Sequence, residues 1–211
     1  MERRVIGVDE AGRAPLAGPV AVGCVSIPDG FDVRKEFPGV NDSKLLTPKK
    51  RAEIYALVLR RAERGDLRFC VRFSDHIYID RFGITRAVRR SVWNGVRTLA
   101  PRINSEQAEV KIFLDGLLQA PRQYKQETII GGDRLVPLIS LASIVAKVRR
   151  DKLMCRMAKL YPQYGFELHK GYGTRRHWDA INRFGLCDIH RRTYCSSAVY
   201  NPVDRGPTVV V

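Results

Sequence analysis

Four carboxylates differ from the other acidic residues because each follows a short apolar segment with the pattern of a strand. They are Asp9, Glu10, Asp115 and Asp133. Carboxylates that gather at strand ends repel one another, so a shared site requires a cation. Oxygen ligands without a neighbouring His or Cys favour a hard ion, Mg²⁺ or Mn²⁺, over zinc. Two such divalent cations would activate a water and stabilise the leaving oxygen of a phosphodiester.

Each of these carboxylates also has a purely structural interpretation. Asp115 and Asp133 each lie in a glycine-containing turn, where an aspartate side chain often bonds the nearby backbone. Asp9 and Glu10 could merely cap a turn. In a regular strand these two side chains would face opposite sides. They can share one site only if the strand ends there and Gly12 bends the backbone beyond it.

The chain is strongly basic. It contains 37 Lys and Arg against 22 Asp and Glu, which gives a formal net charge of +15 at pH 7. This imbalance favours a polyanionic partner, and nucleic acid is the first candidate. On charge alone, the alternatives are a basic solvated surface, a ribosome-associated protein or a protein of anionic membranes.

Composition sets the broad class of the protein. Hydrophobic residues make up 45% of 211, enough for one sizeable core and too many for a disordered chain. The five cysteines are scattered and form no C-x-x-C pair, which argues against a disulfide framework or a thiolate zinc site. We see no signal peptide and no apolar run that could span a membrane. We therefore expect a cytoplasmic protein with reduced thiols and no membrane partner.

The carboxylates must be positioned by an α/β core. Apolar residues in strand-like runs predict strands over residues 5–8, 19–27, 67–73, 110–114 and 128–130. The first two are expected to form a hairpin. Helical spacing, with caps at Thr47 and Thr174, predicts helices over residues 48–65, 84–99, 138–160 and 175–184. The strands before Asp115 and Asp133 should each place an aspartate at their exit.

The segment Asp9-Glu10-Ala11-Gly12-Arg13, followed by residues 15–20, closely resembles the opening motif of type 2 ribonuclease H, or ribonuclease HII. Further segments resemble that family's motifs in the same order. They are Asp42-Ser43-Lys44, residues 113–116, Gly132-Asp133, residues 139–148 with Arg150-Asp151, residues 164–174 and residues 190–192. Together they span residues 5 to about 195.

This resemblance implies a ribonuclease H-like fold, with a central mixed β-sheet flanked by helices and additional C-terminal helices. It implies a single catalytic domain over residues 1–195, followed by a tail or extension over residues 196–211. Asp9, Glu10, Asp115 and Asp133 would hold two divalent cations. The expected reaction is hydrolysis of the RNA strand of RNA–DNA hybrids and cleavage 5′ to ribonucleotides embedded in DNA, which leaves 3′-hydroxyl and 5′-phosphate ends. A monomer is expected.

The resemblance also implies a sensor for the 2′-hydroxyl, the group that distinguishes RNA from DNA. In the family, a G-R-G turn contacts the ribose and a tyrosine stacks on the following sugar. These positions correspond to Gly12, Arg13, Ala14 and Tyr172, so alanine replaces the second glycine. If residue 14 needs positive φ or a close substrate contact, its β-carbon costs about 1–2 kcal/mol and alters junction specificity. If its dihedral angles are ordinary, alanine is tolerated.

Cations and one hydroxyl are candidates for phosphate contacts. They are Arg13, Ser43, Lys44, Lys147, Lys170, Arg191 and Arg192. Any of these charges could instead be solvated, Lys147 could pair with an acidic neighbour, and Ser43 could cap a turn. For His169 and His190 we expect structural hydrogen bonds.

Two other functions fit the same residues. A structure-selective DNA nuclease or a type 3-like ribonuclease H would keep the fold and the metals. Arg13, in place of the lysine of type 3 enzymes, and the short segment before Asp9 favour type 2. The other alternative is a catalytically impaired module that only binds hybrids, and the presence of all four carboxylates argues against it.

Overall fold

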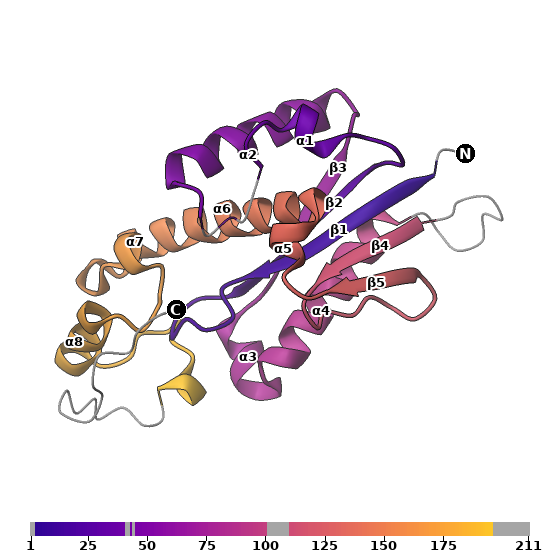
Figure 1. Cartoon of the computed structure of the whole chain (residues 1–211). Helices are drawn as coiled ribbons and strands as arrows, with labels where there is room; N and C mark the ends of the chain where they lie inside the picture. The colour runs from indigo at the N-terminus through magenta and orange to yellow at the C-terminus, as the bar shows by residue number, and fades with distance from the viewer. Residues whose placement is uncertain (1–2, 41–42, 44, 101–109, 196–211) are drawn as a thin grey trace.

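A five-stranded sheet forms the centre of the computed structural model, which describes residues 3–40, 43, 45–100 and 110–195 (Figure 1). Its order is β3-β2-β1-β4-β5. The strands are β1 (Arg4–Ala11), β2 (Val20–Pro28), β3 (Arg68–Ser74), β4 (Val110–Asp115) and β5 (Lys125–Ile129). β1 and β2 form the predicted antiparallel hairpin, and β3 continues it. β4 and β5 run parallel to β1, so the sheet is mixed, as predicted.

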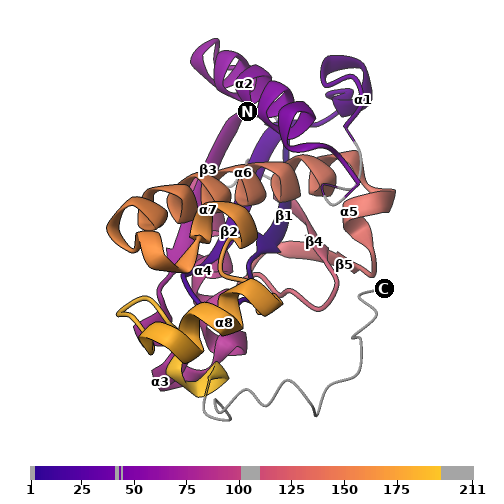
Figure 2. The ribbon, with the colours of Figure 1, turned by 90° about the vertical axis from the view of Figure 1, so that its left-hand side faces the viewer.

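Helices cover both faces of the sheet (Figures 1 and 2). They are α1 (Val33–Glu36), α2 (Pro48–Glu63), α3 (His76–Phe82), α4 (Ile84–Leu99), α5 (Gly132–Leu135), α6 (Pro137–Leu160), α7 (Phe166–His169) and α8 (Arg175–Phe184), with 3-10 turns η1 (Pro162–Tyr164) and η2 (Arg192–Tyr194). α6 lies on one face with α1 and α2, and α4 lies on the other. In the part of the chain that the structure describes, no helix is both long and apolar enough to cross a membrane.

The long predicted helices are confirmed. The Thr47 side chain accepts a hydrogen bond from the Lys50 amide at 3.1 Å and caps α2, whose first residue is Pro48. The Thr174 side chain caps α8 in the same way. The four-residue helices α1, α5 and α7 and the seven-residue α3 were not predicted, because so few turns leave no clear hydrophobic period.

Two predictions about the carboxylates were wrong in detail. β1 does not end at Asp9 and Glu10 but continues through them to Ala11. Asp133 does not lie at a strand exit, because a glycine pair follows β5 and Asp133 belongs to the short helix α5.

Alternate side chains of β1 face different helices. Ile6 and Val8 pack into the core on the α4 side, whereas Val5 packs into the core on the α6 side. Because side chains alternate along a strand, Asp9 points to the same face as Val5, toward α6. The direction of this carboxylate is therefore fixed by the pleat of the sheet.

Helix α6 approaches the sheet closely beside Asp9. Gly23 is the register partner of Asp9 on β2. A β-carbon at Gly23 would lie 2.3 Å from the carbonyl oxygen of Ala142 on α6. This close approach brings the polar face of α6 to the end of β1.

A smaller C-terminal part packs onto the turn between β1 and β2. Its core joins Leu16 and Ala17 of this turn to Met154 on α6 and to Phe166 and Ile181 beyond it. Ala17 also forms a β-bridge with His190. The predicted C-terminal helices thus border the same end of the sheet as the carboxylates.

We predict that Gly23→Ala lowers the free energy of unfolding by about 1–3 kcal/mol, because the added methyl group forces α6 off the sheet. Denaturant unfolding of the variant and the wild type measures the difference. An unchanged unfolding midpoint would show that α6 can move away from β2 without loss of stability.

Candidate active site

Three of the four predicted carboxylates converge. One oxygen each from Asp9, Asp115 and Asp133 lies within 4.8 Å of the other two. Asp9 comes from β1, Asp115 from the last position of the neighbouring parallel strand β4, and Asp133 from α5. The Asp133 amide donates to the Asp115 carboxylate at 3.3 Å, which fixes α5 against the end of β4. The fold therefore joins residues separated by more than a hundred positions in the chain.

Asp9 is buried beside other negative charges. Burial raises the pKa of its carboxyl well above its usual range, and the charges of Glu10 and Asp115 raise it further. A hydrogen bond from Ser143 on α6 and another from the Glu10 amide, at 2.7 Å, oppose this shift. Without a cation, ionised Asp9 is thus strongly disfavoured.

Glu10 lies outside the group of three. Its side chain pairs with Arg13 at 3.2 Å, and only 17% of that side chain is exposed. Burial raises the Glu10 pKa, the charge of Arg13 lowers it, and the charge of Asp115 raises it again. Glu10 is therefore near enough to interact with the carboxylate group, although it leaves the strand on the opposite face from Asp9.

The carboxylate group fits a hard divalent cation. It offers only oxygen ligands, it is largely buried, and burial together with the charges of Glu10 and Asp115 raises the pKa of Asp9. His169, His177 and His190 form a separate cluster, and the described group of candidate ligands contains no histidine. An all-oxygen donor set of this kind suits a hard divalent cation.

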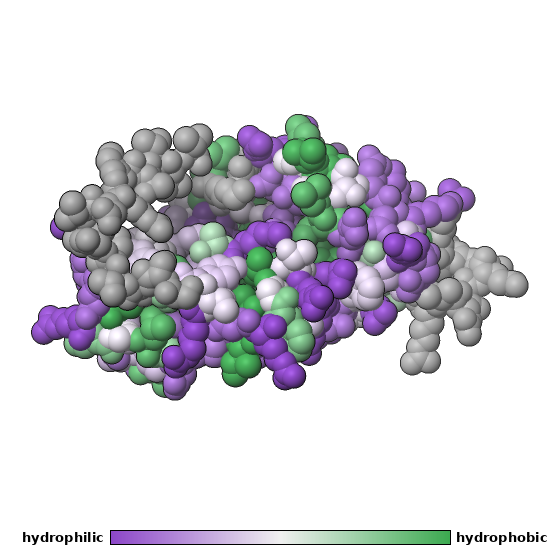
Figure 3. Space-filling view, turned by 90° about the horizontal axis from the view of Figure 1, so that it is seen from below, coloured by the Kyte–Doolittle hydropathy of each residue, from purple (hydrophilic) through white to green (hydrophobic). Residues whose placement is uncertain are grey.

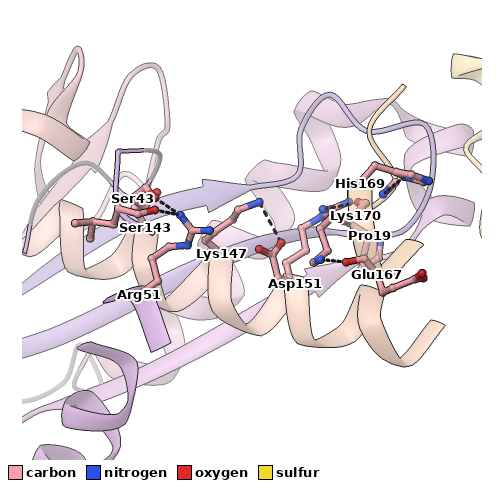
Figure 4. Close-up of polar contacts among 12 residues, drawn as sticks. Pro19, Ser43, Arg51, Ser143, Lys147, Asp151, Glu167, His169 and Lys170 are labelled. Atoms are coloured by element: carbon pink, nitrogen blue, oxygen red, sulfur yellow. Dashed lines mark hydrogen bonds and ion pairs between the residues drawn. The ribbon is translucent and has the colours of Figure 1, made fainter. Parts of the chain in front are cut away.

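A chain of hydroxyls connects Asp9 to α2. The Ser43 hydroxyl lies 2.8 Å from that of Ser143, and Arg51 donates to the Ser43 carbonyl at 2.7 Å (Figure 4). Ser43 is buried, and its hydroxyl contacts Ser143. This burial does not fit the prediction that the Ser43 hydroxyl contacts a phosphate. Lys44, its neighbour in the D-S-K segment, lies outside the described residues, as does Asp42.

Two buried arginines hold the turn between β1 and β2. The Arg191 guanidinium donates to the carbonyls of Gly12, Arg13 and Gly18 at 2.7, 2.7 and 3.0 Å. The Arg150 guanidinium donates to the carbonyls of Pro19, Ala17 and Lys170 at 2.9, 3.2 and 3.0 Å. Arg191 is fully buried, so the prediction that it contacts phosphate is corrected: its charge positions the turn.

The backbone at Ala14 is ordinary. Lys170 is the only non-glycine with positive φ among the residues the structure describes, so residue 14 does not need glycine for its conformation. Gly12 does, because its φ is +87° and a β-carbon there would lie 1.9 Å from Nε of Arg150. Arg13 and Ala14 are both exposed.

Tyr172 faces solvent between cations. Its residue is 39% exposed, and Lys147 Nζ and the Arg150 guanidinium lie 5.6 and 5.8 Å from its ring centre. Lys147 also pairs with Asp151 at 3.1 Å, the alternative considered from the sequence. The Lys170 ammonium donates to the Glu167 carbonyl (Figure 4). Each of these lysines already has a partner within the chain.

Arg192 is exposed at the start of η2. Its amide donates to Asp80 at 2.8 Å, while its guanidinium remains at the surface. Of the cations predicted to contact phosphate, Arg13 and Arg192 are the most accessible ones described.

Buried histidines fix the backbone of Tyr172. Nδ1 of His177 lies 3.0 Å from the Tyr172 carbonyl, which can only accept, so Nδ1 carries the proton and Nε2 does not. Nε2 of His190, 3.0 Å away, therefore donates to His177. Nδ1 of His190 then accepts from the Cys187 amide at 2.9 Å. Burial lowers the pKa of His177 to about 3 and that of His190 to about 4, so both rings are neutral.

Sequence reasoning did not assign roles to Ser143, Arg150 and His177. A signal was present for the first two, because Ser143, Lys147 and Arg150 are spaced i, i+4 and i+7 and lie on one face of a helix. His177 had no such signal, because its partners come from distant turns.

Comparison with known proteins identifies close relatives. A family model described as Ribonuclease HII matches residues 6–197. The Ribonuclease HII of Ruminiclostridium cellulolyticum is 40% identical over 195 residues, which cover 92% of this chain and 71% of the relative. That of Geobacter sulfurreducens is 41% identical over 192 residues, 91% of this chain and 82% of the relative.

Solved structures share the fold. The ribonuclease H2 of Pyrococcus horikoshii OT3 superposes with a TM-score of 0.66 at 25% identity, over 90% of this chain and 93% of that one. The RNase HII of Archaeoglobus fulgidus, solved as a complex with PCNA, has a TM-score of 0.70 at 22% identity, over 90% and 94% of the two chains.

We predict that Asp9→Asn stabilises the metal-free protein at neutral pH. With its pKa raised on folding, Asp9 binds more protons in the folded than in the unfolded state, so its contribution to stability falls as pH rises from about 4 through the raised pKa. Asparagine removes that penalty. In chelator at pH 7 the variant should therefore unfold at a higher midpoint, and Mg²⁺ or Mn²⁺ should stabilise it less than the wild type. A lower midpoint in chelator would contradict this account.

We also predict that acid destabilises the histidine network. The pKa values of His177 and His190 are lowered on folding, so the stability they confer is complete above about pH 6.5 and is lost toward pH 4, by roughly 1.4 kcal/mol per pH unit for each ring. His177→Asn keeps a donor toward the Tyr172 carbonyl but cannot titrate. Urea unfolding between pH 7.5 and 4.5 should show a shallower slope for the variant, and equal slopes would refute this origin.

Proposed function

The chain belongs to the ribonuclease HII family, and we propose that it is a metal-dependent endonuclease that hydrolyses the RNA strand of RNA–DNA hybrids. We further propose that it cuts on the 5′ side of ribonucleotides embedded in DNA and leaves 3′-hydroxyl and 5′-phosphate ends. The observation that carries this proposal is the convergence of Asp9, Asp115 and Asp133 at the end of the sheet in a chain of net charge +15.

In the proposed enzyme, Asp9, Asp115 and Asp133 hold two divalent cations, Mg²⁺ or Mn²⁺, and Glu10 contributes from the edge of the group. Ions of this kind supply an activated water and compensate charge on the reacting phosphodiester. Ser143 orients the Asp9 carboxylate by its hydrogen bond, and Ser43 orients Ser143. The buried position of Asp9 keeps its oxygens from being fully hydrated.

Recognition of the ribose is proposed to fall to the turn of Gly12, Arg13 and Ala14. The carbonyls of Gly12 and Arg13 are turned inward to Arg191. The amides of Arg13 and Ala14 donate to no residue in the described ranges, and both residues are exposed. Free N–H groups at an exposed turn can donate to a 2′-hydroxyl, the group that DNA lacks.

Tyr172 is proposed to pack against the sugar that follows the cut. Its carbonyl is fixed by His177 and its ring lies among cations, which together limit its motion and place it near phosphate. Lys147, Lys170, Arg13 and Arg192 would contribute positive charge along the backbone, with Lys44 as a further candidate from outside the described residues. We propose a monomer with one catalytic domain over residues 1–195; residues 196–211 are not described.

The test is cleavage of a labelled DNA duplex with one embedded ribonucleotide, beside a long RNA–DNA hybrid, in Mg²⁺, Mn²⁺ or chelator. We expect metal-dependent cleavage of both, with the cut 5′ to the lone ribonucleotide. Asp9→Asn should reduce cleavage by about 100-fold or more while binding persists, because it removes a metal ligand and no phosphate contact. Asp179→Asn, an exposed carboxylate on α8, serves as the control.

The outcomes separate the alternatives. Cleavage of the long hybrid only would show altered junction specificity, and restoration of junction cleavage by Ala14→Gly would assign it to the β-carbon. Binding without cleavage in either metal would mean a hybrid-binding module and would overturn the proposed enzyme.

A further inference from the structure

Helix α4 carries a row of arginines on the face of the sheet opposite α6. Its buried side consists of residues such as Val88, Val92 and Val96. Its exposed side carries Arg86, Arg89, Arg90 and Arg97, with the partly buried Trp93 between them. The spacing 86, 90, 93, 97 follows one face of a helix over three turns, roughly 16 Å.

These four guanidiniums have no carboxylate partners in the described part of the chain. None of them forms an ion pair, and α4 contains no acidic residue. The acidic residues of the neighbouring segment 75–82 are engaged elsewhere. Asp75 caps α3, and Asp80 accepts from the amides of Arg192 and Thr193. The row is therefore a region of uncompensated positive charge.

Aromatic rings hold the arginines in place. Arg89 and Arg97 lie 5.7 and 5.6 Å from the Trp93 ring centre, and Arg90 lies 4.4 Å from that of Tyr78. Trp93 is itself fixed, because its indole donates to the Gln119 carbonyl at 3.2 Å. A guanidinium stacked on a ring keeps its N–H groups directed outward for a phosphate.

The row begins at the end of the sheet where β1 ends, on the face opposite α6, and leads away from that end. The Ser74 hydroxyl at the end of β3 donates to the Ala87 carbonyl at 3.0 Å, so α4 starts at the edge of the sheet where β1 ends. From there α4 runs back along the sheet (Figure 1), and the view from below shows hydrophilic and hydrophobic residues intermixed on the surface (Figure 3).

We propose that this arginine row is a second nucleic-acid contact, one that binds the phosphate backbone of duplex DNA independently of sequence and of ribonucleotides. A straight, rigid row matches a regular duplex, which carries one negative charge per about 1.7 Å of axis. Base stacking by single strands is disfavoured here, because the Trp93 ring is already covered by arginines and tied to Gln119. The contact would retain the protein on DNA outside its cleavage site.

The experiment measures binding of the full chain to a ribonucleotide-free DNA duplex in chelator, by fluorescence anisotropy from 50 to 200 mM salt. The test variant combines Arg86→Gln, Arg89→Gln, Arg90→Gln and Arg97→Gln. The matched control removes the same charge from exposed residues elsewhere, with Lys49→Gln, Arg60→Gln, Arg64→Gln and Lys159→Gln. A third variant replaces the four α4 arginines by lysine, which retains charge but not guanidinium stacking.

We expect the α4 glutamine variant to bind about 10-fold more weakly near 0.1 M salt than the control. The slope of log affinity against log salt concentration should be shallower by roughly 3, because each lost phosphate contact removes about one unit. The lysine variant should keep most of the affinity. Single-turnover cleavage of a hybrid at saturating enzyme should stay within about twofold of wild type.

Three results would overturn the proposal. They are equal affinities for the α4 variant and the control, an unchanged salt slope, or a loss of saturated cleavage that reveals damage to the active site. Because binding is measured in chelator on DNA without ribonucleotides, failure here is distinguishable from failure of the proposed nuclease function.

Discussion

Two guanidiniums buried among backbone carbonyls hold the functional end of this protein together. Arg150 and Arg191 each donate to three carbonyls, and all but one of these belong to residues 12–19. A buried cation is stable only when its N–H groups are satisfied, so each guanidinium requires the turn to keep one shape. Burial lowers the Arg150 pKa to about 10, which leaves it charged at neutral pH. The turn, the end of β1 and the C-terminal helices are thereby fixed relative to one another.

The carboxylates obey the opposite constraint. Arg150 and Arg191 donate to carbonyls within the chain, whereas Asp9, Asp115 and Asp133 bring their oxygens close to one another. Burial and the charges of Glu10 and Asp115 raise the cost of ionising Asp9. Such an arrangement stores unfavourable electrostatic energy that a divalent cation releases. The protein thus combines a rigid frame of buried guanidiniums and carbonyls with a small group of carboxylates that a divalent cation would stabilise.

Much of this arrangement could be predicted from the sequence. Hydrophobic period and caps located the long helices, including α4 over its full length, and most of the strands, although β5 covers residues 125–129 where 128–130 was expected. The carboxylates expected at strand ends indicated candidate metal ligands. Periodicity could not show that β1 continues through Asp9 and Glu10, because polar residues interrupt the apolar run before the ladder with β2 ends. Nor could it show that Arg191 is buried. An arginine between two other polar residues has the pattern of a surface charge, and only the packing of the C-terminal part onto residues 12–19 reverses this.

The Arg191 hydrogen bonds also determine when the site can form. They join residues 173 to 179 positions apart, and the Ala17–His190 bridge spans the same interval. Local helices and the β1–β2 hairpin can assemble early, whereas contacts of such long sequence separation form late because closing the loop costs entropy first. During synthesis, the turn beside the carboxylates therefore stays unclamped until Arg191 has left the ribosome. Positioning of the turn is thus coupled to synthesis of Arg191, so a product that terminates before this residue would carry the carboxylates beside a turn that is not held in place.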